Sequence, residues 1–359
     1  MYTRKNYSIK RMLSWTRRYI YIFALLAIIP VVLYEVLNWK WLHLPWLPIG
    51  LIGTALAFII GFKNNASYGR LWEARKIYGG IVNASRLFAT MVNDFITNEY
   101  AVKDKTDEEF FKIKKELILR HVAWMTSLRH ALRVKKPWET TSSNRSDKEV
   151  MKKMHIQEYV YSLSDELKGY LSEEEKQTVL SMTNKQTSVL NLQSKHIKEL
   201  KFQGLIDDFR HMEFKNMIGE LFTLQGKAER IKNFPYPRQF ATLNLFFAWI
   251  FMILLPFGLM TEFEKIGETL LKTEVTGTLF SFMADNFIWL TIPFSIIISW
   301  IFFTMERIGD VSENPFEGIA NDVPITTISR AIEIDIREMI GDDKSEIPKP
   351  HPEYVNTQM

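Results

Sequence analysis

The chain has 359 residues, of which 24% are charged, with a formal net charge of +4 and no cysteine. The small net charge gives no indication of nucleic-acid binding, and the lack of cysteine excludes disulfides, zinc–thiolate sites and thiol catalysis. A mean hydropathy of -0.08 resembles that of a soluble protein, but this average conceals a strong segregation of apolar from charged segments.

Four segments of the chain are almost free of charge. They are residues 19–37, 44–62, 240–260 and 286–305, and the only charged residue in them is Glu35. Each is close to the roughly 20 residues that cross the hydrocarbon core of a bilayer. They are apolar all round, whereas a helix that packs on the core of a soluble protein keeps a polar face towards solvent. The sequence therefore predicts an all-α membrane protein with four transmembrane helices.

The charges that flank these spans predict their orientation. Basic residues without any acidic partner precede the first span: Arg4, Lys5, Lys10, Arg11, Arg17 and Arg18. By the positive-inside rule they place the N-terminus in the cytoplasm. The link between the third and fourth spans is richer in acidic residues, with Glu262, Glu264, Glu268 and Glu274, which suits the external side. We expect a multi-pass protein of the plasma (inner) membrane with both termini cytoplasmic.

One face of the second span carries a regular stripe. Thr54, Phe58 and Phe62 recur every four residues and therefore share a helical face. If several copies surround an axis, this face would form a narrow collar that an unsolvated ion crosses only at a cost. The alternative is that both phenylalanines pack against lipid or against other helices, and the spacing alone does not separate the two.

Residues 63–239 read as a helical domain without an evident catalytic site. Apolar side chains at three-to-five spacing predict an amphipathic helix over residues 107–134. Ser172 followed by Glu175 forms a capping-box pattern, and a polar stretch at 140–147 predicts a loop. No phosphate-binding loop or nucleophile elbow is present, and no histidines pair at a metal-ligand spacing. We expect no enzyme activity, cofactor or metal, which leaves a channel or a membrane-anchored signalling or scaffold protein without a pore.

Three segments in this order resemble the bestrophin family, particularly its bacterial members. Residues 61–88 read GFKNNASYGRLWEARKIYGGIVNASRLF and share most of the family run that follows the pore helix, although Lys63 replaces the usual arginine and Leu71 a tryptophan. The family's motif is matched here by Asn65, Tyr68, Arg70, Trp72, Glu73 and Arg75, with Ala66 and Ala74 between them. Residues 228–237 (AERIKNFPYP) and 314–338, with Asn-Pro-Phe and Asp-x-Pro, complete the resemblance.

The resemblance implies a homopentameric ion channel with one axial pore. It places the pore neck at Thr54, Phe58 and Phe62, and the matching motif residues near the pore mouth. It also implies a second constriction on a cytosolic helix, which we expect over about residues 205–229, with Leu205, Phe209, Met212 or Asn216 as the constricting side chain.

Gating and selectivity are less defined by the resemblance. Animal bestrophins are gated by calcium through an acidic run after Asn-Pro-Phe, where this chain has only Glu317 and Asp322. Two separated carboxylates fall short of the six or more oxygens that calcium takes, so we expect no calcium gating. Because animal members resemble chloride channels while bacterial ones can pass monovalent cations, the sign of the conducted ion stays open.

The expected organisation follows from the spans and from the resemblance. The expected partners are small monovalent ions, the lipid bilayer and further copies of the chain, which pack through the basic N-terminal segment and residues 312–340; nucleic acid is not expected. The predicted divisions are a basic cytoplasmic N-terminal segment, transmembrane helices 1 and 2, a cytoplasmic helical domain, transmembrane helices 3 and 4, and a cytoplasmic C-terminal arm, over residues 1–18, 19–62, 63–239, 240–305 and 306–359.

Overall fold

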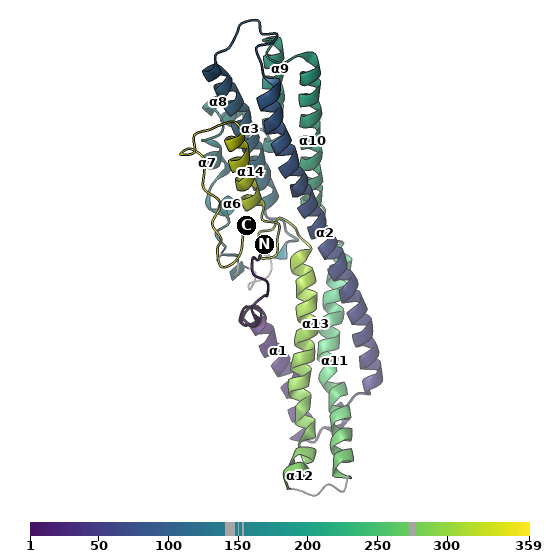
Figure 1. Ribbon diagram of the computed structural model, residues 1–359. Helices are drawn as coiled ribbons and strands as arrows, with labels where there is room; N and C mark the ends of the chain where they lie inside the picture. The colour runs from purple at the N-terminus through teal and green to yellow at the C-terminus, as the bar shows by residue number, and fades with distance from the viewer. Residues whose placement is uncertain (141–147, 150, 153, 273–277) are drawn as a thin grey trace. The chain divides into compact units, whose positions relative to one another are not determined.

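The computed structural model describes residues 1–140, 148–149, 151–152, 154–272 and 278–359. Within these residues the chain is helical (Figure 1). It divides into two compact units. We call Lys5–Gly69 with Tyr236–Glu313 the span unit, and Met1–Arg4 with Arg70–Pro235 and Asn314–Met359 the lobe unit. The long helix α2 (Trp46–Phe95) contributes residues to both units.

The span unit contains the long apolar helices. Among the described residues, four helical stretches are long and apolar enough to cross a membrane, as the sequence predicts. The helices of the unit are α1 (Ile9–Glu35), the first part of α2, α11 (Arg238–Leu271) and α13 (Thr291–Ser312). The short elements η1 (Lys40–Leu42), α12 (Thr278–Asp285) and η2 (Phe287–Leu290) connect them.

The span unit is held together by large apolar side chains between its helices. Helix α13 packs on both α1 and α11, and Phe303 of α13 lies edge-on against Phe23 of α1 at 5.5 Å between ring centroids. Leu56 of α2 and Leu255 of α11 are buried in the same cluster. Gly53 permits a close approach here, because a methyl group in its place would lie 2.7 Å from the Phe251 ring.

The lobe unit is a bundle of helices around one large hydrophobic core, and a smaller buried cluster includes Met154 and Met359. Its helices are α3 (Asp107–Arg133), α6 (Gln157–Val160), α7 (Leu163–Leu167), α8 (Glu173–Ser181), α9 (Lys185–Phe202), α10 (Asp208–Asn233) and α14 (Ile325–Met339), together with the second part of α2. Phe88, Trp124 and Phe214 lie buried at its centre. The capping box of Ser172 and Glu175 is present at the start of α8, which confirms that prediction.

The structure differs from the expected elements in three places. The helix that contains the second span does not end near Phe62, because α2 is unbroken over its 50 residues from Trp46 to Phe95. The acidic link after the third span is largely helical, since α11 runs to Leu271; Glu274 lies outside the described residues. Helix α14 packs on α3 of its own chain and buries Ile332 and Ile336 in the lobe core, so that apolar face is not available to a neighbouring copy. Of the predicted loop at 140–147, residues 141–147 lie outside the described residues.

Candidate functional site

The first part of α2 separates a buried face from an exposed one. Its buried residues recur at helical spacing and pack against the other spans: Ile49, Gly53, Leu56, Ile60, Lys63 and Ser67. Thr54, Phe58 and Phe62 lie on the other side and are exposed, with the two phenylalanine side chains 67% and 73% accessible. These rings therefore do not belong to the core of the subunit. This excludes the alternative in which they pack against the other helices of the same subunit.

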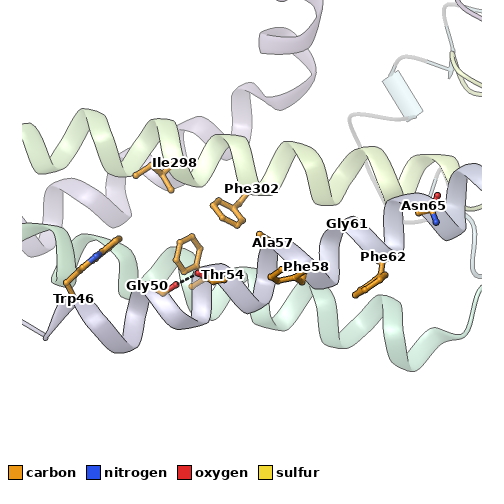
Figure 2. Close-up of a pocket in the computed structure, with 12 residues that line it drawn as sticks. Trp46, Gly50, Thr54, Ala57, Phe58, Gly61, Phe62, Asn65, Ile298 and Phe302 are labelled. Atoms are coloured by element: carbon orange, nitrogen blue, oxygen red, sulfur yellow. Dashed lines mark hydrogen bonds between the residues drawn. The ribbon is translucent and has the colours of Figure 1, made fainter.

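The exposed face of α2 borders an open, mostly apolar groove in the span unit (Figure 2). The groove has a volume of about 840 Å³. Its lining consists of Trp46, Gly50, Gly53, Thr54, Ala57, Phe58, Gly61, Phe62 and Asn65 of α2, Phe251 of α11, and Ile298 and Phe302 of α13. The hydroxyl of Thr54 donates to the carbonyl of Gly50 over 3.0 Å. This bond uses the only proton of the hydroxyl, so Thr54 presents lone pairs to the groove.

The motif residues after this groove have different environments. Asn65 lines the groove, and Tyr68, Trp72 and Arg75 are exposed. In the lobe unit Arg70 donates to the carbonyls of Ile231 and Phe234, at 3.2 and 2.8 Å, where α10 ends. These contacts satisfy carbonyls that a helix C-terminus leaves without an internal donor.

Glu73 takes part in an ion pair that also joins α2 to α10. Its carboxylate lies 3.1 Å from the guanidinium of Arg230, on a partly exposed surface. The partner of Glu73 comes from the second matching segment, residues 228–237, rather than from the motif itself. Arg70 and Glu73 thus both attach α2 to the end of α10.

The candidates for a second constriction separate into two groups. Phe209 and Met212 lie on an exposed face of α10, with 87% and 59% of their side chains accessible, and Asn216 continues that face. Leu205 is 1% exposed and lies in the lobe core. It precedes α10, which begins at Asp208 instead of near residue 205. Leu205 is therefore not available to line a pore in this structure.

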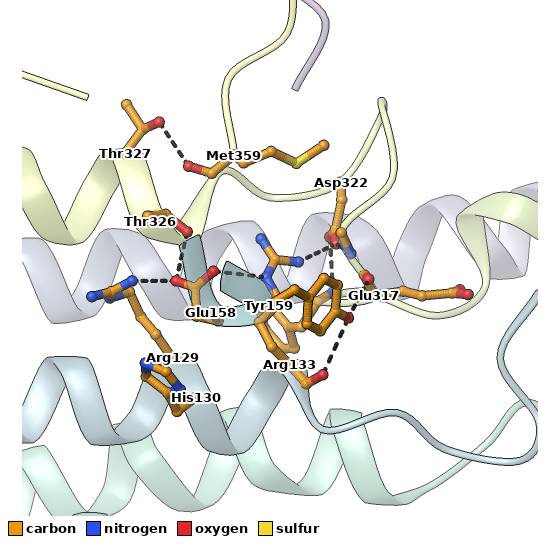
Figure 3. Close-up of polar contacts among 12 residues, drawn as sticks. Arg129, His130, Arg133, Glu158, Tyr159, Glu317, Asp322, Thr326, Thr327 and Met359 are labelled. Carbon is orange, nitrogen blue, oxygen red and sulfur yellow. Dashed lines mark hydrogen bonds and ion pairs between the residues drawn. The ribbon is translucent and has the colours of Figure 1, made fainter. Parts of the chain in front are cut away.

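The loop after Asn-Pro-Phe is closed around a buried carboxylate (Figure 3). Asp322 accepts hydrogen bonds from the backbone N–H groups of Phe316, Gly318 and Val323, at 2.6 to 2.8 Å. It also accepts from the guanidinium of Arg133 on α3, over 3.0 Å. Phe316 has a φ of 72°, a left-handed conformation that is uncommon outside glycine and asparagine, so these contacts hold the loop in a strained form.

The second carboxylate of this loop is also engaged. Glu317 is fully buried and accepts a hydrogen bond from the hydroxyl of Thr140 over 2.9 Å. The backbone carbonyl of Glu317 accepts from the Tyr159 hydroxyl over 3.2 Å. Both carboxylates thus lie in the protein interior with donors from the chain itself.

A buried network of charges extends from this loop to α6 and α14. Glu158 pairs with Arg129, lies 3.8 Å from Arg133 and accepts from the Thr326 hydroxyl over 2.7 Å. Burial alone would raise the pKa of Glu158, but the two guanidinium groups outweigh it and hold that pKa at about 2. The expectation for the lobe overlooked this network; the available signal was the four-residue spacing of Arg129 and Arg133 on the apolar side of their helix.

One histidine of the lobe, His121, lies in its core. His121 is fully buried, lies 2.9 Å from the Ser85 hydroxyl and stacks on Phe88. In the part of the chain that the structure describes, no cluster of three or more His, Cys, Asp or Glu side chains is arranged to hold a metal ion.

The model of the family described as "Bacterial/Fungal Bestrophin protein" matches residues 11–284 and 276–338. The chain belongs to this bestrophin family. Together with the four apolar helices, the match makes it a membrane protein.

Similar proteins are known in sequence and in structure. The chain is 28% identical over 309 residues to a "Voltage-dependent anion channel-forming protein" of Ralstonia nicotianae, covering 84% of this chain and 82% of that protein. It is 24% identical over 302 residues to a protein of the same description from Escherichia coli K12, covering 84% and 78%. A solved bacterial bestrophin homolog from Klebsiella pneumoniae shares the fold, with a TM-score of 0.70, 22% identity and coverage of 90% and 98%.

Proposed function

We propose that this bestrophin is a passive channel for small monovalent anions. The observation that carries the proposal is the exposed Thr54, Phe58 and Phe62 face of α2, which borders an apolar groove that one subunit leaves open. The names of the bacterial relatives, as anion channel-forming proteins, support conduction rather than a purely structural role.

The pore forms when copies of the chain surround a common axis, as a homopentamer. In that assembly the faces of α2 turn inward, and each copy contributes Phe58 and Phe62 to an apolar collar. Such a collar conducts only while it is wetted, because a bare ion pays several kcal/mol in an apolar environment. An exposed pair of large aromatic rings beside an apolar groove supports this placement, since contiguous apolar surface of this kind marks a contact with lipid or with other chains.

Anions are the conducted ions in this proposal. The edge of a phenylalanine ring carries partial positive charge and its face partial negative charge. Rings that present their edges to the axis favour an anion over a cation. Thr54 adds polar oxygen to the groove, where it can hydrogen-bond to the water that accompanies the ion.

A second constriction lies on α10 of the lobe unit. Phe209 and Met212 are the side chains proposed to form it, because they project from the exposed face of that helix. Asn216, one turn further along, supplies a polar side chain on the same face.

Conduction does not require calcium. The two carboxylates after Asn-Pro-Phe are already bonded within the chain, Asp322 to three N–H groups and Arg133, and Glu317 to Thr140. A calcium ion would have to displace these donors and to compete with a buried guanidinium, and it needs more oxygens than two carboxylates offer.

The protein spans the plasma membrane with both termini in the cytoplasm. The pairing of the two ends of the chain supports one common side, because Thr3 N–H donates to Asn356 and Gln358 N–H to Met1. The lobe unit is the cytoplasmic part. It contains most of the predicted divisions 63–239 and 306–359, together with Met1–Arg4.

A reversal-potential measurement tests this function. The purified chain is reconstituted in planar bilayers with a gradient of KCl, and current is recorded with and without protein. We expect a current that reverses near the equilibrium potential of chloride. Reversal near that of potassium would make it a cation channel, and an assembled protein without current would favour the scaffold alternative.

A further inference from the structure

Lys63 follows Phe62 directly but belongs to the buried side of α2. Its side chain is 1% exposed, and its ammonium lies 2.5 Å from the carboxylate of Glu306 on α13, which is 2% exposed. At about 100° per residue, Lys63 lies about 100° round the helix from Phe62 and about 140° from Phe58. When Lys63 faces Glu306, Phe58 and Phe62 therefore lie on the exposed side of α2 that borders the groove.

The neighbouring acidic residues pair with other cations, so Lys63 is the ion-pair partner of Glu306. Helix α13 carries Glu306 and Asp310 near its end, and Glu313 is its C-cap residue. Asp310 pairs with Arg307 of the same helix and lies 4.0 Å from Lys63. Glu313 pairs with Arg238 at the start of α11. Each carboxylate has its own cation, so the pair of Lys63 and Glu306 fixes which residues of α2 and α13 lie opposite each other.

The next residue of α2 adds a contact that depends on shape. The side-chain amide of Asn64 donates to the carbonyl of Met305 over 3.1 Å. Its oxygen approaches Gly309 so closely that a methyl group at Gly309 would lie 2.1 Å from it. A larger residue at Gly309 would therefore displace the side-chain amide of Asn64. Lys63, Asn64, Glu306 and Gly309 together form what we call the α2–α13 interlock.

A buried ion pair contributes little net stability, because desolvation of both charges offsets their attraction. The interlock therefore fixes geometry rather than supplying most of the stability of the span unit, which the apolar cluster around Leu56 and Phe303 provides.

We propose that the α2–α13 interlock sets the rotation of α2 about its own axis and so aims Phe58 and Phe62 at the groove. Lys63 and Glu306 are positioning residues, since neither side chain lines the groove itself. The link from rotation to conduction rests on the proposed function, but the rotation can be measured without any current.

The absence of native cysteine provides a direct test of rotation. Single cysteines replace Ile60, which is buried, or Phe62, which is exposed, in the full chain reconstituted in liposomes. A small charged methanethiosulfonate is the probe. We expect it to modify F62C and to leave I60C protected, because a thiol reacts only where solvent reaches it.

Removing both charges of the interlock, with K63M/E306M, avoids leaving one buried charge without a partner. In this background we expect the modification rate of I60C to rise about tenfold or more as α2 rotates, because solvent then reaches the buried thiol. K63R should keep I60C protected, since arginine preserves the charge. The control pair K265Q/E262Q removes an exposed ion pair of the same unit and should leave I60C protected.

A disulfide cross-link measures the orientation of α2 in a second way, which does not depend on water in the groove. Cysteines at Asn64 and Gly309 should form an intramolecular disulfide on oxidation, because cysteine is shorter than asparagine at this close approach. K63M/E306M should lower the yield. If I60C stays protected and the cross-link persists in K63M/E306M, the interlock does not set the rotation. If these reporters behave as expected but the wild-type chain carries no current, the interlock stands and the channel function fails.

Discussion

The guanidinium of Arg133 and the carboxylate of Asp322 form an ion pair at 3.0 Å, and both side chains are fully buried. They come from α3 and from the loop before α14, 189 residues apart in the sequence. This pair joins the loop after Asn-Pro-Phe to the centre of the lobe unit, and it determines how that loop responds to mutation and to cations.

Breaking this pair on one side should destabilise the lobe unit strongly. Arg133→Met leaves Asp322 with its three N–H donors but without its charge partner, and removing one partner of a buried pair costs about 3–5 kcal/mol. The matched control is Arg86→Met, because the pair of Arg86 with Asp335 is largely exposed and should contribute less than about 1 kcal/mol. Thermal unfolding of the detergent-solubilised protein measures both. Equal losses for the two variants would contradict the assigned role of Arg133.

Calcium should not alter the current. The loop carboxylates are bonded to Arg133, Thr140 and backbone N–H groups, so they offer no vacant cage. Bilayer recordings that exchange a strong chelator for millimolar calcium on the cytoplasmic side should give the same open probability. Steep activation by calcium would show that the loop opens and that backbone carbonyls complete a site.

Acid should weaken the lobe through Glu158. Its pKa is lowered in the folded state to about 2, from a value of 4.5 in an unfolded chain. The stabilisation is therefore fully present above pH 4.5 and is lost as the pH falls towards 2, and a shift of this size corresponds to roughly 3 kcal/mol. Melting temperatures from pH 7 to pH 2.5 should decline for the wild type. Glu158→Gln should start lower and show a smaller further decline, and parallel curves would contradict this assignment.

Two glycines of α2 should respond oppositely to alanine. A methyl group at Gly53 would lie 2.7 Å from the Phe251 ring, whereas at Gly61 it would meet nothing within 4 Å. We expect Gly53→Ala to lower the melting temperature, because overpacking costs about 1–3 kcal/mol. Gly61→Ala should leave it unchanged or raise it, since alanine favours a helix by roughly 1 kcal/mol. A loss at Gly61 equal to that at Gly53 would argue against the groove.

The signals that predicted correctly are local in the sequence. The four spans depend on the apolar length of each segment, and the cap of α8 depends on Ser172 and Glu175 three residues apart. The Thr54, Phe58 and Phe62 stripe is also local, and the structure places it on one exposed face.

The features that were missed depend on distant contacts or on cooperative helix formation. Leu205 shares a plausible spacing with Phe209 and Met212, but only the packing of the lobe core shows that it is buried. Helix α2 continues through Gly61, Gly69, Gly79 and Gly80, where single glycines weaken a helix by roughly 1 kcal/mol each without ending it. The pairs of Arg133 with Asp322 and of Lys63 with Glu306 join residues too far apart for any spacing pattern to indicate.

The conductance of the variant F58A/F62A decides whether Phe58 and Phe62 form the collar of the pore. Removing both exposed rings should widen and wet the collar, which lowers the desolvation barrier for a small anion. We expect a homopentamer with a markedly larger single-channel chloride conductance. The control F246A removes an exposed phenylalanine of α11 that does not line the groove and should conduct like the wild type. Size-exclusion profiles recorded alongside the currents establish assembly. A pentamer of F58A/F62A with unchanged conductance would contradict the collar.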